Sequence, residues 1–300
     1  PPYDTAAMLA FFAQRQLRGV ELVREAADDA SLVRTLAVEA GGVVHRGWLA
    51  VRFDAAHHQL VLRVADSLAV ALPLVIRRVR SAFDLDADPR GINKVLHAHF
   101  PGGDGLRVPG ALSGYEVAVR AVLGQQITVA AARTLAQRVV DRFGEPIATP
   151  WPELTRLFPE PAALAGASGD ALGQLGIVRQ RQAAIVAIAQ AVHEKRLELH
   201  GSADLAATLQ ALTALPGIGD WTAQYIAMRA LRWPDAFPSG DVALHKALRV
   251  QGEPRPARAA LAASEAWRPW RSYAVIRAWH GLAAPAPSTC APPAVLEEPA

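Results

Sequence analysis

The alternation of hydrophobic and polar positions divides the chain into two regions. In the first region, three segments alternate and are rich in β-branched residues: Ser31–Val38, Val43–Asp54 and Gln59–Ala65. Gly41-Gly42 and His57-His58 separate them at the positions where tight turns are expected. Hydrophobic residues at period two, broken by short turns, predict an antiparallel sheet.

Helical spacing flanks these segments. Ala6–Arg15 and Leu68–Phe83 carry apolar residues three and four positions apart, with Pro73 near the start of the second segment. Together with the predicted sheet, they indicate a small α+β domain over residues 1–88.

From Pro89 onward the pattern is almost entirely helical, with Gly or Pro between segments. The clearest amphipathic segments are Ser113–Gly124, Thr128–Phe143, Pro161–Ala167, Gly169–Leu175, Gln180–His193 and Ala203–Ala214. The predicted fold class is therefore α+β, with an N-terminal antiparallel sheet domain followed by a mostly α-helical region over residues 89–282. Residues 283–300 are rich in Pro and Ala, and we expect them to form a disordered tail.

Composition narrows the class of protein without naming a function. Of the 300 residues, 51% are hydrophobic and 20% are charged, which is ordinary for a globular protein. No stretch approaches the roughly 20 apolar residues of a membrane span, and no cleavable signal pattern is visible. The net charge of +3 permits nucleic-acid binding but does not require it. The sequence begins without methionine, so a trimmed chain and the C-terminal part of a longer polypeptide are both open.

A single cysteine, Cys290, excludes an intramolecular disulfide and any multi-cysteine metal site within the chain. A reducing cytoplasmic location fits this cysteine usage. The scattered histidines His45, His57 and His58 are interpreted as surface or turn residues, not as ligands. We therefore assign no chemistry to the N-terminal domain and expect it to give structural support, with room for some DNA contact.

A glycine-rich turn is the first candidate for function. Leu215-Pro216-Gly217-Ile218-Gly219 lies between Ala203–Ala214 and Trp221–Leu231, two segments of helical character. Two glycines one residue apart allow positive φ and leave backbone N–H groups uncovered at a helix N-terminus, where a DNA phosphate could bind. A plain connection between two helices, with glycine just beyond a helix end, explains the same pattern.

Twenty residues beyond Trp221, Asp241 follows a loop marked by Pro238 and Gly240 and precedes Val242–Val250, which is predicted to be helical. An aspartate there can simply cap the helix, which stabilises by ~1 kcal/mol. A carboxylate at the mouth of a cleft can also stabilise an oxocarbenium-like sugar and orient or deprotonate a water. The two roles are compatible.

The hairpin, the Gly/Pro-rich loop and the aspartate together resemble the helix-hairpin-helix glycosylase superfamily, and more narrowly the bacterial DNA-3-methyladenine glycosylase II family. The resemblance is carried along nearly the whole chain by Pro1–Asp4, Phe83–Leu85, Arg120–Gln126, Leu215–Ala223 and Trp267–Ala274. It implies a base excision repair enzyme with a helix-hairpin-helix core of two subdomains and the active-site cleft between them. Such an enzyme hydrolyses the N-glycosidic bond of a flipped 3-methyladenine, 7-methylguanine or related alkylated base and leaves an abasic site.

By this resemblance Asp241 takes the position of the catalytic carboxylate, and Trp221, Tyr225 and Trp279 match the aromatic residues of the base pocket. Trp221 stands where bifunctional relatives carry a nucleophilic lysine, so lyase activity through a Schiff base should be absent. Gln126 falls at the wedge that fills the gap left by the flipped nucleotide. The best-known family member has an aliphatic wedge, whereas Gln126 is polar and can fill the gap while hydrogen-bonding to the orphaned base.

Further expectations come from the same resemblance. The phosphate-binding hairpin consists of Gly217, Ile218, Gly219 and Asp220, and the backbone carbonyls of Thr213, Leu215 and Ile218 match the positions that hold a structural monovalent or divalent cation. Catalysis would need no cofactor. Gly240 stands where a second acidic residue can precede the catalytic one, which leaves Asp241 as the only carboxylate candidate in that loop. Trp267, Trp270 and Tyr273 repeat at three-residue spacing and are expected in the core.

The implied partner is double-stranded DNA containing alkylated bases, bound by a monomer in the bacterial cytoplasm at the nucleoid. An alkylated purine carries positive charge, which an aromatic pocket attracts by ~0.5–2 kcal/mol per favourable contact. Two alternatives stay open: a glycosylase for deaminated or oxidised bases, and a non-catalytic DNA-binding module of an alkylation-response protein.

Overall fold

The computed structural model describes residues 1–26 and 29–283. Its sheet has four antiparallel strands in the order β1-β2-β3-β4: β1 (Glu21–Arg24), β2 (Ser31–Ala40), β3 (Val43–Asp54) and β4 (Gln59–Val64). The three strands expected from the alternation are confirmed. The short edge strand β1 was not predicted, because four residues are too few to show a period.

Two helices cover the sheet and close the N-terminal core. These are α1 (Thr5–Ala13) and α2 (Leu72–Ala82), with a 3₁₀ turn at Asp66–Leu68 between β4 and α2. Pro73 sits in the first turn of α2, where its missing N–H costs nothing, so the α-helix begins later than the expected Leu68. Leu9, Leu32, Leu49, Leu68 and Phe83 are fully buried in this core.

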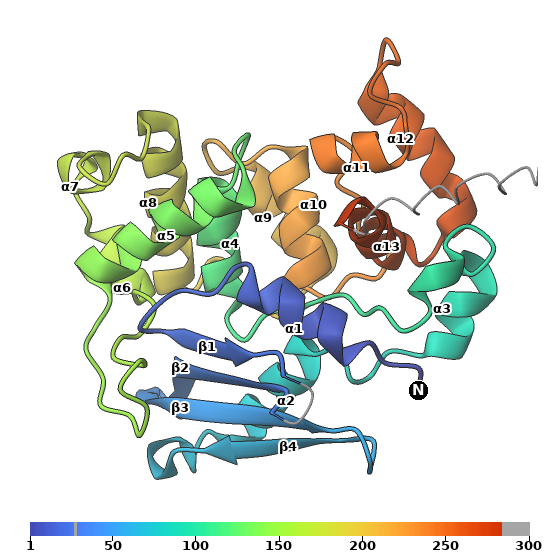
Figure 1. The fold of residues 1–300 in the computed structure, drawn as a ribbon. Coiled ribbons are helices and arrows are strands. Elements are labelled where there is room, and N and C mark those ends of the chain that lie inside the picture. The colour runs from blue at the N-terminus through green and yellow to red at the C-terminus, as the bar shows by residue number, and fades with distance from the viewer. Residues whose placement is uncertain (27–28, 284–300) are drawn as a thin grey trace, which may run out of the picture.

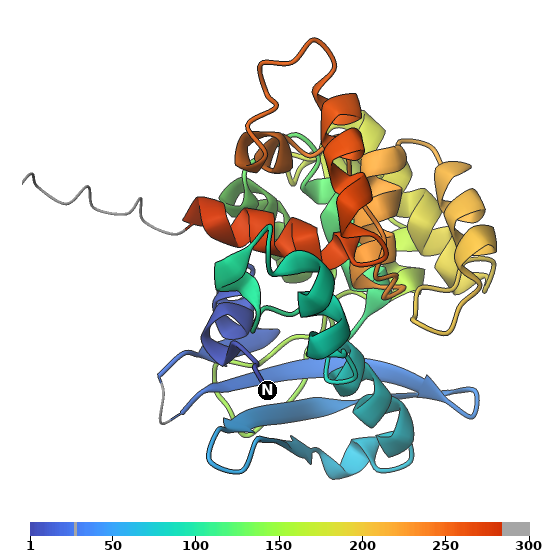
Figure 2. The same ribbon diagram turned by 90° about the vertical axis from the view of Figure 1, so that its right-hand side faces the viewer.

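The remaining helices form a second, larger core on the other side of α1. They are α3 (Pro89–Leu96), α4 (Gly114–Leu123), α5 (Val129–Phe143), α6 (Pro161–Ala165), α7 (Gly169–Gly173), α8 (Arg179–His193), α9 (Leu205–Thr213), α10 (Asp220–Arg229), α11 (Val242–Ala247), α12 (Pro256–Ser264) and α13 (Arg271–Ala283). Helix α4 is its central member, with eight of its ten residues buried, and it packs against α5, α8 and α10. Figures 1 and 2 both show the sheet at one end of the molecule and these helices at the other, with α1 between them.

The two regions are joined by polar contacts as well as by packing. The connection between α5 and α6 runs back along the sheet (Figure 1), where Thr35 Oγ1 of β2 donates to the carbonyl of Arg156 and Trp48 packs edge-on against Trp151. This segment covers the second face of β2, which explains why β2 is buried on both sides.

Two expectations about the extent of the regions stay predictions. The boundary at residue 88 is one. The disordered tail is the other, because all but the first of its residues lie outside the described part of the chain. Among residues 1–26 and 29–283, no helix is both long enough and apolar enough to cross a bilayer.

Candidate active site

A cleft of about 1420 Å³ lies between the helices and reaches α1 of the N-terminal region. It is lined by residues of α1, α4, α8, α10, α11 and α13, and by the loops that precede α5 and α10. The residues predicted as catalytic carboxylate, base pocket and wedge all line it: Asp241, Trp221, Tyr225, Trp279 and Gln126. Of the predicted phosphate-binding residues, Gly217 and Gly219 line it, whereas Ile218 and Asp220 do not. Residues up to 153 positions apart in sequence are thus gathered in one cavity.

Asp241 is the N-cap of α11, as its position before a helix predicted, and its carboxylate accepts three hydrogen bonds. Oδ1 accepts from the backbone N–H of Leu244 at 2.6 Å and from Trp279 Nε1 at 3.1 Å. Oδ2 accepts from Trp221 Nε1 at 3.0 Å. The carboxylate is therefore held by the helix on one side and by the two predicted pocket tryptophans on the other.

The three aromatic residues form one row beside this carboxylate. Trp221 and Tyr225, one turn apart on α10, stack with ring centroids 5.4 Å apart and planes 16° from parallel. Tyr225 and Trp279 lie 6.3 Å apart with planes inclined by 41°. Neither separation leaves room for a base between the rings, but all three residues line the cleft, where a base could stack on them.

The hydroxyl of Tyr225 lies in a strongly cationic corner of the cleft. Arg229 donates from Nη1 to this oxygen at 2.9 Å and is itself fixed by the carbonyls of Pro109 and Gly110. Burial opposes ionisation of Tyr225, but the guanidinium groups of Arg229 and Arg15 outweigh it and lower the pKa of the phenol. Burial, aided by Arg229, lowers the pKa of Arg15 to about 10. Burial raises the pKa of the other three tyrosines, Tyr3, Tyr115 and Tyr273.

A buried ionic network forms the floor of the cleft and joins the sheet to α4. Arg34 of β2 bonds Glu21 at 3.1 Å and also bonds Glu116, which in turn accepts from Arg120 at 2.8 Å. Burial opposes the charge on Glu116, but Arg34 and Arg120 lower its pKa below the usual value. Burial raises the pKa of Glu21, which has fewer compensating partners. Arg120 also donates to the carbonyl of Arg15, so the network fixes the end of α1 against the cleft.

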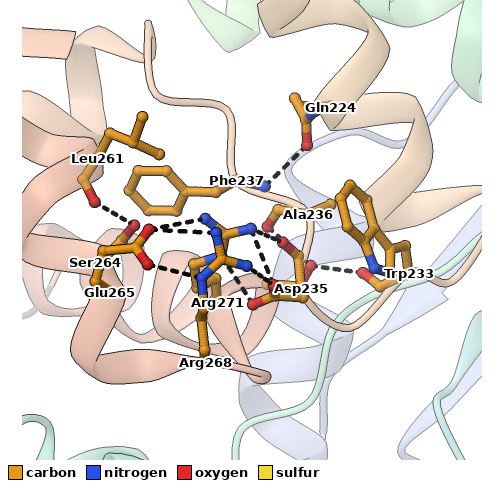
Figure 3. A network of polar contacts seen from close by, with 11 residues as sticks. Gln224, Trp233, Asp235, Ala236, Phe237, Leu261, Ser264, Glu265, Arg268 and Arg271 are labelled. Atoms are coloured by element: carbon orange, nitrogen blue, oxygen red, sulfur yellow. Dashed lines mark hydrogen bonds and ion pairs between the residues drawn. The ribbon is translucent and has the colours of Figure 1, made fainter. Parts of the chain in front are cut away.

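The loop that leads to Asp241 is held by α13, as Figure 3 shows. Arg271 donates to both carboxylate oxygens of Asp235, at 2.8 and 2.9 Å, and to its backbone carbonyl at 2.8 Å. Ser272 Oγ donates to the carbonyls of Trp233 and Ala236. Because α13 also carries Trp279, the same helix positions the loop and supplies one of the donors to Asp241.

The glycine-rich turn forms a hairpin between α9 and α10, but its two glycines play different parts. Gly217 has φ of +75°, the left-handed conformation that the sequence led us to expect. Gly219 has φ of −87°, so only Gly217 uses the positive φ that the two glycines allow. A Cβ atom at Gly219 would meet no atom within 4 Å, which leaves the backbone N–H groups at the start of α10 uncovered.

The carbonyl oxygens expected to hold a cation can be compared with this geometry. Within the described residues, no hydrogen bond ends on the carbonyls of Thr213 or Ile218, and that of Leu215 accepts only from the N–H of Ile218 at 3.3 Å. Neutral oxygen donors suit a hard cation. No cluster of three or more His, Cys, Asp or Glu side chains that could hold a metal occurs in the same part of the chain. The three carbonyl oxygens therefore fit the structural ion that the resemblance implies.

Gln126 lies in the loop between α4 and α5, where an intercalating residue needs to project. Its side chain is exposed and its φ is +57°, an uncommon value for a residue other than glycine. The preceding Gln125 is half-buried, and its side chain donates to Gly217 of the hairpin and to Thr222 of α10. The wedge loop and the hairpin are thus in direct contact.

Comparison with known families agrees with this geometry. Residues 1–113 match the AlkA N-terminal domain model, and residues 119–272 match the HhH-GPD superfamily base excision DNA repair protein model. The chain is 35% identical to DNA-3-methyladenine glycosylase 2 of Escherichia coli strain K12 over 93% of its own length and 94% of that protein's. The chain belongs to the HhH-GPD superfamily of base excision DNA repair proteins.

Further relatives agree with this membership. This HhH-GPD protein is 36% identical over 95% of its length to a probable bifunctional transcriptional activator/DNA repair enzyme AlkA of Mycobacterium tuberculosis, of which it spans 56%. Its fold matches the 3-methyladenine DNA glycosylase of Archaeoglobus fulgidus with a TM-score of 0.73 at 21% identity, covering 93% of this chain and 94% of that one. It also matches the 8-oxoguanine glycosylase/lyase of Clostridium acetobutylicum with a TM-score of 0.65 at 12% identity, over 94% and 93% of the two chains.

Sequence reasoning missed several residues of the HhH-GPD cleft. The N-terminal region was expected to give structural support with room for some DNA contact, and none of its residues was assigned to the site, yet Phe11 and Arg15 line the cleft. Arg229 and Gln125 were also passed over, because the sequence around an arginine on a helix or a glutamine in a loop does not show which residues it will contact. The expected core role of Trp267 and Tyr273 is confirmed, since they are 5% and 6% exposed. Trp270 is only partly buried, packed at the edge of the same core.

Proposed function

We propose that this protein is a monofunctional DNA glycosylase that hydrolyses the N-glycosidic bond of alkylated bases such as 3-methyladenine and 7-methylguanine. The observation that carries the proposal is the hydrogen-bonded group at the cleft wall. There, the carboxylate of Asp241 accepts from the indoles of Trp221 and Trp279, which are also the walls of an aromatic pocket. The relatives named as 3-methyladenine glycosylases support the same substrate class.

The hairpin is proposed to grip one DNA phosphate with the uncovered N–H groups at the start of α10. Phosphate binding at a helix N-terminus orients the duplex without reading its sequence. Gln126 then fills the gap left by the flipped nucleotide and can hydrogen-bond to the orphaned base. Flipping costs a few kcal/mol, and less where the lesion already weakens pairing. A structural cation on the carbonyls of Thr213, Leu215 and Ile218 would stiffen the hairpin.

The chemical step needs little beyond one carboxylate. As the bond between C1′ and the base breaks, its electron pair goes to the base, and the positive charge of an alkylated purine is neutralised. The sugar becomes oxocarbenium-like, and Asp241 stabilises that charge. A water oxygen then bonds to C1′, and the carboxylate accepts the proton that the water loses. Because the base leaves as a neutral molecule, no general acid is required.

Trp221 at the position of the lyase lysine supports hydrolysis without strand cleavage. An indole nitrogen has no basic lone pair and cannot form a Schiff base with C1′. The indole of Trp221 instead donates to Asp241. Borohydride treatment during turnover should therefore trap no covalent enzyme–DNA adduct, and a trapped adduct would contradict the monofunctional assignment.

An excision panel tests the proposal. Duplexes carrying 3-methyladenine, 7-methylguanine, hypoxanthine or 8-oxoguanine are incubated with the wild-type protein and with Asp241→Asn. We expect release of the methylated bases by the wild type, loss of release in the variant and retained binding of the variant to abasic-site DNA. Activity on 8-oxoguanine alone would overturn the substrate assignment, and unchanged excision by Asp241→Asn would remove Asp241 from its role.

One observation favours a second substrate class, the deaminated purines. A neutral base leaves with negative charge, and the guanidinium groups of Arg229 and Arg15 beside Tyr225 would stabilise that charge. Release of hypoxanthine in the same panel tests this addition. A non-catalytic DNA-binding module is disfavoured, because the carboxylate of Asp241 inside a DNA cleft would only repel phosphates.

We also propose that the protein acts as a monomer in the bacterial cytoplasm, at the nucleoid. The cleft gathers all of its lining from one chain, so no second copy is needed to complete it. Size-exclusion chromatography with light scattering, with and without abasic-site DNA, would show one chain per duplex.

A further inference from the structure

Gln125 has no role in the proposed chemistry, yet it makes contacts in three directions. Its side-chain Nε2 donates to the carbonyl of Gly217 at 2.9 Å and to Thr222 Oγ1 at 2.9 Å. Its own backbone carbonyl accepts from the guanidinium of Arg181 on α8. One half-buried residue therefore joins the loop after α4 to the hairpin, to α10 and to α8.

We propose that Gln125 is a positioning residue that couples the hairpin's grip on a DNA phosphate to the placement of Gln126 in the duplex. The inference rests on the proposed function, because it needs a phosphate on the hairpin and a wedge that enters DNA. It concerns the step before bond cleavage, so it can be measured independently of excision.

The chemistry of the contact fixes its direction. The carbonyl of Gly217 can only accept, so the amide nitrogen of Gln125 must face it, and the contacts to Gly217 and Thr222 use both N–H groups of that amide. The Gly217 carbonyl points towards Gln125, and the N–H of the same peptide plane points away, to the carbonyl of Leu215 at 3.3 Å. The amide of Gln125 thus sets the orientation of a peptide unit in the turn that holds phosphate.

The hairpin side of this contact has little freedom to absorb a displacement. Gly217 is in the left-handed conformation, and a Cβ atom there would lie 3.2 Å from Cβ of Ala184 and 3.4 Å from the carbonyl oxygen of Gln180. Because the turn packs this closely on the first turns of α8, a displacement of the hairpin also moves the residues that are hydrogen-bonded to it. Gln125 is such a neighbour, and Arg181 ties it to the same end of α8.

The wedge side, in contrast, has weak internal support. Its backbone bonds are long: the N–H of Gln125 reaches the carbonyl of Val122 at 3.3 Å, and the N–H of Ile127 reaches that of Gly124 at 3.5 Å. Gln126 sits between them with φ of +57° and an exposed side chain. The loop's conformation therefore depends on the contacts of Gln125 more than on its own hydrogen bonds.

The test uses two substitutions of similar length. Gln125→Glu replaces the donor with an acceptor opposite the Gly217 carbonyl, and Gln125→Met removes the hydrogen bonds without adding charge. Thr222→Val is the matched control, since it removes one of the two acceptors and leaves the contact with Gly217. Three quantities are measured: affinity for undamaged duplex, fluorescence of 2-aminopurine beside an abasic-site analogue as a signal of flipping, and the single-turnover rate of 7-methylguanine release.

We expect Gln125→Met to keep the wild-type affinity for undamaged duplex while the flipping signal and the release rate fall together by about tenfold, the factor that one lost hydrogen bond can carry. Gln125→Glu should lose flipping and release at least as much and should also bind duplex more weakly, because it adds a negative charge beside the hairpin. Thr222→Val should lower the flipping signal and the release rate by less than the Gln125 variants do, because it keeps the hydrogen bond to Gly217. Adding Gln126→Ala to either Gln125 variant should cause no further loss, because both residues act on one step.

Other results would overturn the coupling. Wild-type flipping in both Gln125 variants would do so, as would a parallel loss of duplex affinity in Gln125→Met or an additive loss with Gln126→Ala. Thermal unfolding of each variant separates these outcomes from misfolding, and Gln125→Met carries the test where Gln125→Glu does not fold. Failure of the wild type itself to release 7-methylguanine would instead contradict the proposed function.

Discussion

The two tryptophans that bond Asp241 can be tested against each other. Trp221→Phe and Trp279→Phe each remove one indole N–H donor and keep an aromatic ring in the pocket wall. The two oxygens of the carboxylate differ in what remains: Oδ1 keeps the N–H of Leu244 at 2.6 Å after the loss of Trp279, whereas Oδ2 accepts from Trp221 alone within the described residues. Trp221→Phe should therefore release one edge of the carboxylate completely.

The magnitude follows from the bonds. A hydrogen bond to a charged group contributes about 1.5–3 kcal/mol, and each 1.36 kcal/mol of barrier changes a rate tenfold. If the bond only orients Asp241, Trp221→Phe should lower the single-turnover rate by roughly 10- to 100-fold. Trp279→Phe should lower it by less than about tenfold, because Leu244 still holds the same oxygen.

The assay is single-turnover release of 7-methylguanine, a cationic lesion, and hypoxanthine, a neutral one, from otherwise identical duplexes. An orienting role for the indoles predicts the same fractional loss for both lesions, since the carboxylate serves the sugar and not the base. It also predicts that Trp221→Phe has no further effect when added to Asp241→Asn. Losses confined to one lesion, or equal losses from the two tryptophan variants, would refute the reasoning.

Three further predictions test other parts of the structure. A spectrophotometric titration should find one tyrosine that ionises below the usual pKa near 10, since arginines lower the pKa of Tyr225. The ionised Tyr225 stabilises the fold at pH values above the pKa of an unfolded tyrosine. This stabilisation is lost as the pH falls through the lower pKa that Tyr225 has in the folded protein, and the low-pKa ionisation should be absent in Tyr225→Phe. Gly219→Val should weaken duplex binding and leave the free energy of unfolding unchanged, because the new side chain points into open space. Gly217→Ala should lower the free energy of unfolding by about 1 kcal/mol, measured by urea denaturation, because Gly217 has a positive φ. Arg271→Met should destabilise by about 1.5–3 kcal/mol in the same assay, because the buried Asp235 then keeps only Arg268 as a cationic partner. A smaller loss than that of Gly217→Ala would contradict the role given to the Arg271–Asp235 pair of Figure 3.

Local pattern was sufficient for much of the fold. Alternating residues predicted β2, β3 and β4 within two residues at each end, and helical spacing predicted α5 and α8 almost to the residue. These elements are long enough to repeat their period and have one clearly apolar face. The start of α2 was predicted less well, because it depends on one residue. Pro73 fits the first turn of a helix at no cost, so the helix begins at Leu72 and not at the expected Leu68.

The site was predicted only in part, because its contacts join residues that are far apart in the chain. Asp241 could be proposed as an N-cap and as a catalytic carboxylate from its neighbours alone. Its bonds to Trp221 and Trp279 span 20 and 38 positions, and those of Gln125 to Gly217 and Thr222 span more than 90. No local period encodes such pairs, since packing of whole helices brings them together. The family resemblance named the tryptophans as pocket walls but gave no reason to expect their N–H groups on the carboxylate.

These N–H contacts change how selectivity can arise in such a cleft. If Trp279 holds the base as proposed, a base that stacks well on it would keep the indole in the plane from which its N–H reaches Asp241 at 3.1 Å. A base that fits poorly must turn the ring, and the same rotation weakens the hold on Oδ1. Because recognition and orientation of the carboxylate use one side chain, a poor fit lowers the rate of bond cleavage in addition to lowering affinity. In this proposal, selectivity between bases comes from two sources. One is the few kcal/mol of aromatic stacking, and the other is the orientation of the Asp241 carboxylate, which stabilises the charge on the sugar.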